Sequence, residues 1–198
     1  MKRIILLAVA LFLCCHQISA QKWVDALKGV ASSAIEEIAG GKLTAARMIG
    51  TWNYYQPGIK LSSEDVATEL AASAVTTSIQ KKLATYYQKV GIRQGSCAFT
   101  FNTDGTFTST FGSRTLSGTY TFNAETSQLQ LNYGKGLLNL GSIPAYVHMN
   151  GDKLQIVFPV DKLVNILVSL GSKSAKLAPL MAIVQKYDSI KLGFEFTK

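Results

Sequence analysis

Cysteine, histidine and proline are scarce in this chain of 198 residues, which contains 3 Cys, 2 His and 4 Pro. Beyond the first twenty residues only Cys97 and His148 remain of the first two types. A disulfide within that part is therefore excluded, and a single cysteine of this kind is usually buried as a small apolar residue. A zinc centre needs several converging Cys, His or carboxylate ligands, and the sequence offers no such cluster, so we expect neither a metal nor a cofactor.

Long apolar runs are also missing, apart from Ile4–Leu13. Lys2 and Arg3 precede this run and Ile18-Ser19-Ala20 follows it, which is the order of a secretory signal peptide cleaved between Ala20 and Gln21. The run is short for a membrane span, and no later stretch is long enough. We therefore expect a periplasmic or secreted protein of 198 − 20 = 178 residues without a transmembrane span.

Lipidation of Cys14 or Cys15 is the alternative processing route. A lipoprotein peptidase requires a small residue before the modified cysteine, whereas Leu13 and Cys14 occupy those places. Cleavage after Ala20 is the better match to the sequence.

Acidic residues are few, with 12 Asp and Glu against 20 Lys and Arg and a net charge of +8. Loss of Lys2 and Arg3 lowers this charge to +6. The densest basic cluster consists of Lys81, Lys82, Lys89 and Arg93. In an exported protein it favours contact with anionic lipid or polysaccharide over nucleic acid. A solvated helix face, kept soluble by its charge, is the alternative.

Alternation of apolar and small polar residues dominates the stretch from Cys97 to Phe158. A period of two is typical of antiparallel strands with one buried face. Asp104-Gly105 and Asn150-Gly151 are hairpin signals. The stretch predicts six strands: two within 97–111, one on each side of Asp104-Gly105, and four over 115–122, 128–133, 143–149 and 153–158.

One strand is predicted before this stretch and one after it. Met48–Tyr55 is closed by Pro57-Gly58, and Ile190–Phe196 alternates to the end. Eight short strands with one apolar face each favour a closed up-and-down antiparallel barrel, in which the last strand joins the first. An open two-layer sandwich is the alternative.

Helical spacing of apolar residues interrupts the strands at four places. It predicts an N-terminal helix over 22–38, a long helix from Ser62 to Val90, and a pair over 160–170 and 177–187. The fold class is therefore mainly β with helical insertions. We divide the chain into a signal peptide (1–20), an amphipathic helix with linker (21–46) and a barrel domain (47–198).

Gly50-Thr51-Trp52 resembles the G-x-W signature of lipocalins, whose tryptophan plugs the closed end of the barrel. Segments 82–92, 99–107 and 187–196 are similar to an uncharacterised family of exported lipocalin-like bacterial proteins. The resemblance implies the fold and carries no activity. Ordinary lipocalins place an arginine from the last strand over the tryptophan, whereas this strand offers only Lys191 and Lys198.

The interior parity collects many aromatic side chains, which an eight-stranded barrel can pack into a solid core or use to line one small cavity. We expect the interior, and any ligand-binding residues, to include Trp52, Tyr54, Phe99, Phe101, Phe107, Tyr120, Phe122, Tyr133 and Phe194. The favoured hypothesis is a non-enzymatic barrel that binds a small apolar or amphipathic molecule. The alternative is an envelope interaction module with a side-chain-filled barrel.

A Cys97–His148 nucleophile is the remaining enzymatic option. Cys97 shares its parity with Phe99 and Phe101, whereas His148 alternates away from Val147 and Met149. The two side chains are therefore expected on opposite faces, out of hydrogen-bond reach. We expect no catalytic residues.

Overall fold

The computed structural model describes residues 42–61, 69–134, 140–171 and 190–198. The predicted signal peptide, the helix over 22–38, the cap at Ser62 and the helix over 177–187 lie outside these residues and stay predictions.

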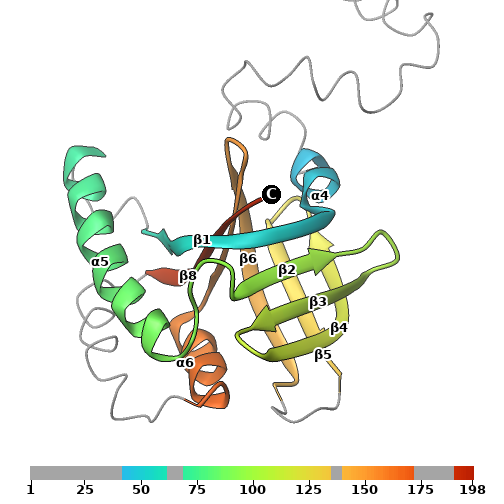
Figure 1. Ribbon diagram of the computed structural model, residues 1–198. Helices are drawn as coiled ribbons and strands as arrows, with labels where there is room; N and C mark the ends of the chain where they lie inside the picture. The colour runs from blue at the N-terminus through green and yellow to red at the C-terminus, as the bar shows by residue number, and fades with distance from the viewer. Residues whose placement is uncertain (1–41, 62–68, 135–139, 172–189) are drawn as a thin grey trace, which may run out of the picture. The chain divides into compact units, whose positions relative to one another are not determined.

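Eight antiparallel strands form a closed barrel in chain order, as predicted, and the sandwich alternative is wrong (Figure 1). The last strand pairs with the first, so closure removes most of the exposed sheet edge. The strands are β1 (Gly50–Lys60), β2 (Cys97–Phe101), β3 (Thr106–Phe111), β4 (Arg114–Asn123), β5 (Gln128–Tyr133), β6 (Ser142–Asn150), β7 (Lys153–Phe158) and β8 (Lys191–Thr197).

The two predicted tight turns join neighbouring strands. Gly105 has a φ of 79° and Gly151 a φ of 64°, values that glycine adopts without strain. Asp104 accepts hydrogen bonds from the backbone N–H of Thr106, at 2.9 Å, and from its hydroxyl, at 2.6 Å. These bonds lower the pKa of the Asp104 carboxyl.

The prediction that Pro57-Gly58 ends the first strand is wrong. β1 continues to Lys60, and after Asn53 it pairs with β8 alone, with a register shift between Tyr54 and Gln56. Pro57 is tolerated because a strand without a second neighbour does not need every N–H for pairing.

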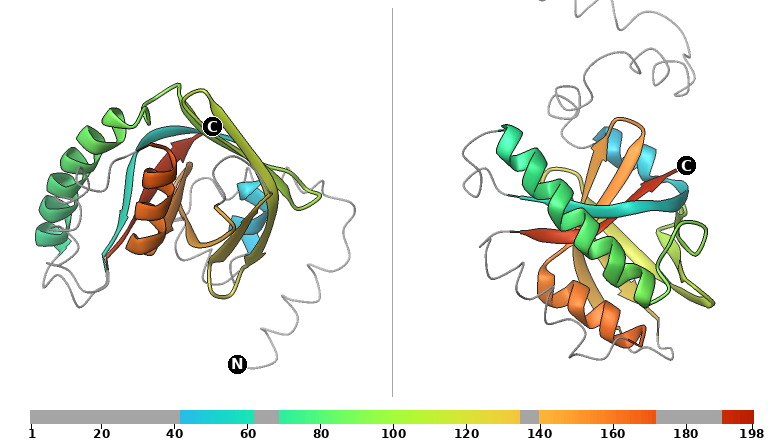
Figure 2. Two further views of the ribbon diagram at one scale, coloured as in Figure 1. Left: turned by 90° about the horizontal axis from the view of Figure 1, so that it is seen from below. Right: turned by 60° about the vertical axis from the view of Figure 1, so that its left-hand side comes forward.

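Three helices accompany the barrel in the described part of the chain. They are α4 (Lys42–Met48), which was not predicted, α5 (Glu69–Lys89) and α6 (Val160–Ser169). α4 contacts β6, α5 packs along β1, and α6 contacts β8 (Figure 2). Leu163, Ile166 and Leu167 of α6 are buried, so its apolar face is used within the fold.

Candidate functional site

The predicted aromatic residues do share the inner face of the barrel. Trp52, Tyr54 and Phe194 are buried there, as are Phe99, Phe101 and Phe107. Tyr120, Phe122 and Tyr133 pack against the same cluster but are only partly buried. Their position agrees with the expected parity; a role in ligand binding stays a prediction.

Phe194 is the centre of this interior. Its ring centroid lies 6.1 Å from that of Tyr54 on β1, 6.0 Å from Phe111 on β3 and 6.0 Å from Phe158 on β7. A second contact between non-neighbouring strands joins Phe99 of β2 to Phe196 of β8, at 5.5 Å. Rings from β2 and β3 therefore meet rings of β8 inside the barrel, although these strands are not neighbours in the sheet.

Tyr87 of α5 belongs to the same cluster and was missed as a site residue. Its ring lies 5.1 Å from that of Phe194, and its hydroxyl donates to the carbonyl of Gly193 at 2.9 Å. Burial raises the pKa of Tyr87 well above its ordinary value. The helical spacing from Leu83 to Tyr87 placed it on the apolar stripe, but its partner in β8 depends on the tertiary fold.

Trp52 lies at the end of the barrel where β1 begins. Its indole N–H donates to the carbonyl of Met48 at 2.7 Å, which ties α4 to the barrel. The Nζ of Lys198 lies 4.9 Å from the ring and donates to the carbonyl of Ile49 at 3.2 Å. Lys198 therefore lies over the tryptophan, where the resemblance to lipocalins implies an arginine.

Cys97 and His148 lie on opposite sides of the barrel wall. Cys97 is buried in the core, where desolvation raises the pKa of its thiol far above the ordinary value. His148 points outward, and burial together with the charges of Lys60 and Lys191 lowers its pKa to about 4. A thiolate–imidazole pair is therefore not assembled from these two residues.

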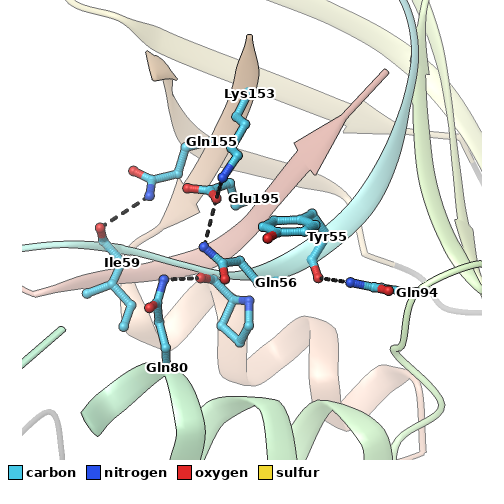
Figure 3. Close-up of polar contacts among 9 residues, drawn as sticks. Tyr55, Gln56, Ile59, Gln80, Gln94, Lys153, Gln155 and Glu195 are labelled. Atoms are coloured by element: carbon cyan, nitrogen blue, oxygen red, sulfur yellow. Dashed lines mark hydrogen bonds and ion pairs between the residues drawn. The ribbon is translucent and has the colours of Figure 1, made fainter. Parts of the chain in front are cut away.

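Glu195 is a buried carboxylate on the outer face of β8 that sequence reasoning did not single out (Figure 3). It accepts a hydrogen bond from the side-chain amide of Gln56 at 2.8 Å and lies 3.6 Å from the Nζ of Lys153. The same Nζ lies 4.5 Å from the ring centroid of Tyr55. Gln56 and Lys153 thus supply Glu195 with a hydrogen-bond donor and a counter-charge within the wall.

Glutamine side chains donate hydrogen bonds to backbone carbonyls along the second half of β1 (Figure 3). Gln94 donates to the carbonyl of Tyr55 at 3.0 Å, and Gln80 of α5 donates to that of Pro57 at 3.1 Å. Gln155 reaches the carbonyl of Ile59 at 3.3 Å. These bonds satisfy the carbonyl groups in the part of β1 after Asn53, which no longer pairs with β2.

The predicted basic cluster lies on and just after α5. Lys81, Lys82, Lys89 and Arg93 are all exposed. Within the described part of the chain none of the four has a carboxylate partner, since the ion pairs there are Lys153–Glu195 and Lys162–Asp161. The Nζ of Lys89 lies 5.5 Å from the ring centroid of Tyr86.

The described residues contain neither a metal-binding cluster nor a membrane-spanning helix. No three His, Cys, Asp or Glu side chains there gather where they could hold a metal ion. None of the helices described is both long and apolar enough to cross a membrane.

Comparison with known proteins agrees with this fold. Residues 25–198 match the family described as Lipocalin-like domain (DUF4923), which covers all eight strands and confirms the resemblance to a lipocalin-like family. Among solved structures, the chain is similar to a DUF4847 family protein from Bacteroides vulgatus ATCC 8482. Their sequence identity is 17% and the TM-score 0.40, over 78% of this chain and 96% of that one. No curated protein sequence matches the chain. The chain therefore belongs to the DUF4923 family of lipocalin-like domains.

Proposed function

We propose that this lipocalin-like protein is an exported, non-enzymatic interaction module that works through the outside of a side-chain-filled barrel. The observation that carries the proposal is the ring cluster around Phe194 of β8, in which the ring of Phe111 on the non-neighbouring strand β3 lies 6.0 Å from that of Phe194. An eight-stranded barrel is only wide enough to be filled by side chains or to hold one small ligand. Rings that already touch across it favour filling.

The basic face of α5 is the contact surface that we assign to this module. Lys81, Lys82 and Lys89 project from one helix, and Arg93 follows it closely. Each basic residue near an anionic lipid surface contributes about 1 kcal/mol to binding. The occupant that we propose is therefore an anionic lipid headgroup layer. α6 is a poorer contact surface, because Leu163, Ile166 and Leu167 are buried in the fold and only Val168 of its apolar side chains is exposed.

Replacing Lys81, Lys82 and Lys89 together by Gln should weaken binding to vesicles that contain anionic phospholipid by about 100-fold, since about 3 kcal/mol is lost. Vesicle co-sedimentation at low salt measures the effect. The control is the Lys60→Gln/Lys162→Gln double variant, which removes two positive charges that belong to β1 and α6 instead of α5. Equal weakening in the control, or no preference for anionic over neutral vesicles, would contradict the proposal.

An apolar ligand inside the barrel is the second candidate, and one observation favours it. The inward-facing side chains of β4, Leu116, Tyr120 and Phe122, remain only partly buried, as does Tyr133 on β5. A ligand beside this row would bury apolar surface, and the tyrosine hydroxyls would orient it. The row borders the buried core, since the ring of Tyr120 lies 5.1 Å from that of Phe101 and the ring of Tyr133 lies 5.0 Å from that of Phe107.

Tyr120→Trp separates the two candidates. In a filled barrel it should destabilise the fold by about 1–3 kcal/mol through overpacking, and a panel of fatty acids, sterols and tetrapyrroles should give no thermal shift. In a ligand-binding barrel a hundredfold excess over Kd should stabilise the wild type by about 2.7 kcal/mol, and Tyr120→Trp should weaken that binding. Saturable binding at one site would replace the first candidate by the second.

A further inference from the structure

The outward faces of β4, β5 and β6 form a shallow groove of about 180 Å³. Its walls are built by two rows of directly paired residues. One row is Asn123, Gln128 and Tyr146, and the neighbouring row is Thr121, Gln130 and Pro144. Because antiparallel strands project alternate residues to the same side, all six side chains face away from the aromatic interior.

The groove contains polar groups but no ionised side chain. In the described contacts, the Gln128 amide and the hydroxyls of Thr121 and Tyr146 have no protein partner. The amide oxygen of Asn123 accepts from the N–H groups of Glu125 and Thr126, which leaves its NH₂ group free. The NH₂ of Gln130 donates to Ser142, which leaves its oxygen free. The groove therefore offers both hydrogen-bond donors and hydrogen-bond acceptors.

To these polar groups, Tyr146 adds an aromatic ring whose orientation is restrained. The Nζ of Lys191 lies 4.8 Å from its ring centroid, a cation–π contact that restrains the ring. Pro144 is the second apolar element of the wall. A flat apolar patch beside neutral donors and acceptors matches a molecule that has C–H faces and a rim of hydroxyls.

The size and charge of the groove narrow the class of ligand. A volume of 180 Å³ corresponds to about six waters at about 30 Å³ each, which is less than a lipid or drug-sized molecule requires. An anion would find no cation in the lining itself. We infer that this groove binds one uncharged sugar ring of a glycan, which stacks on Tyr146 and hydrogen-bonds to Gln128 and its neighbours. The site lies on other elements than the basic face of α5 and does not depend on the proposed function.

The test uses the full mature protein and a panel of neutral oligosaccharides built from glucose, galactose, mannose and N-acetylhexosamines. The expected result is saturable binding by calorimetry to at least one of them. Tyr146→Ala should weaken that binding by about tenfold through loss of the stacking surface. Gln128→Ala, at an exposed position that does not endanger folding, should also weaken it.

Tyr55→Ala is the control, because the ring of Tyr55 lies under a lysine as that of Tyr146 does, but Tyr55 is on β1, outside the groove. It should bind like the wild type. Equal loss in Tyr55→Ala, unchanged binding in both Tyr146→Ala and Gln128→Ala, binding only of uronic-acid-containing glycans, or no binding across the neutral panel would each overturn the inference.

Discussion

Trp52→Ala should destabilise the protein by about 3–5 kcal/mol, the range for deletion of a core aromatic side chain. The indole is only 2% exposed and belongs to the main hydrophobic cluster. Its loss opens a cavity, removes the bond that holds the carbonyl of Met48, and leaves Lys198 without its ring. Chemical denaturation of the two proteins measures the difference in free energy of unfolding.

Two milder variants divide this effect into its parts. Trp52→Phe keeps an aromatic ring but loses the hydrogen bond to Met48, so it should cost less than Trp52→Ala. Lys198→Met removes the cation over the ring together with its hydrogen bond to the carbonyl of Ile49, and should cost about 1 kcal/mol. A loss below about 1 kcal/mol in Trp52→Ala would mean that the tryptophan does not plug the barrel end.

Gly193→Ala should destabilise the fold by about 3 kcal/mol or more, at the upper end of overpacking effects. A Cβ at Gly193 would collide with the carbonyl oxygen of Ile156 and lie 2.8 Å from the Cα of Val157. Both are backbone atoms of the paired strand β7, so neither moves without shifting the strand. The same denaturation experiment detects the loss.

Gly134→Ala is the matched control for this variant. The nearest atom to its added Cβ would be the carbonyl oxygen of Ser117 at 3.5 Å, an ordinary contact distance. We expect a change within about 0.5 kcal/mol, as at surface positions without special constraints. Similar losses in both variants would show that close packing of β7 against β8 is not the cause.

The strands could be predicted because their pattern is uninterrupted. Two strands have the predicted bounds, β5 (Gln128–Tyr133) and β7 (Lys153–Phe158). The first alternates strictly between polar and apolar residues, and the second ends in a run of apolar residues. The predicted end of β1 comes too early, because a Pro-Gly pair such as Pro57-Gly58 usually ends a strand. What keeps the strand going is its pairing with β8, which local sequence does not reveal.

α4 escaped prediction for a related reason. Gly40-Gly41 is a strong stop signal, and the 7 residues of Lys42–Met48 are too few to form a stable helix alone. Burial of Leu43 and Met48 and the bond from Trp52 supply the missing stabilisation. Tertiary contacts decide such short elements.

The interior of the candidate site was more predictable than its outside. Parity alone placed Phe99, Phe101 and Phe194 inside. By contrast, the position of Lys198 over Trp52 depends on how β8 ends, and the groove near Tyr146 depends on the register of three strands. Residues far apart in the chain meet there without a shared pattern.

The glutamine bonds along β1 have a consequence for association between molecules. A strand with one open side is a template on which a strand of another chain can add. Here the carbonyls of Tyr55 and Pro57 already accept from Gln94 and Gln80, and Pro57 has no N–H to offer. A strand of another chain would have to displace the side-chain amides of Gln94 and Gln80. It would also find no N–H donor at Pro57. The open side of β1 is therefore protected against pairing with a strand of another molecule.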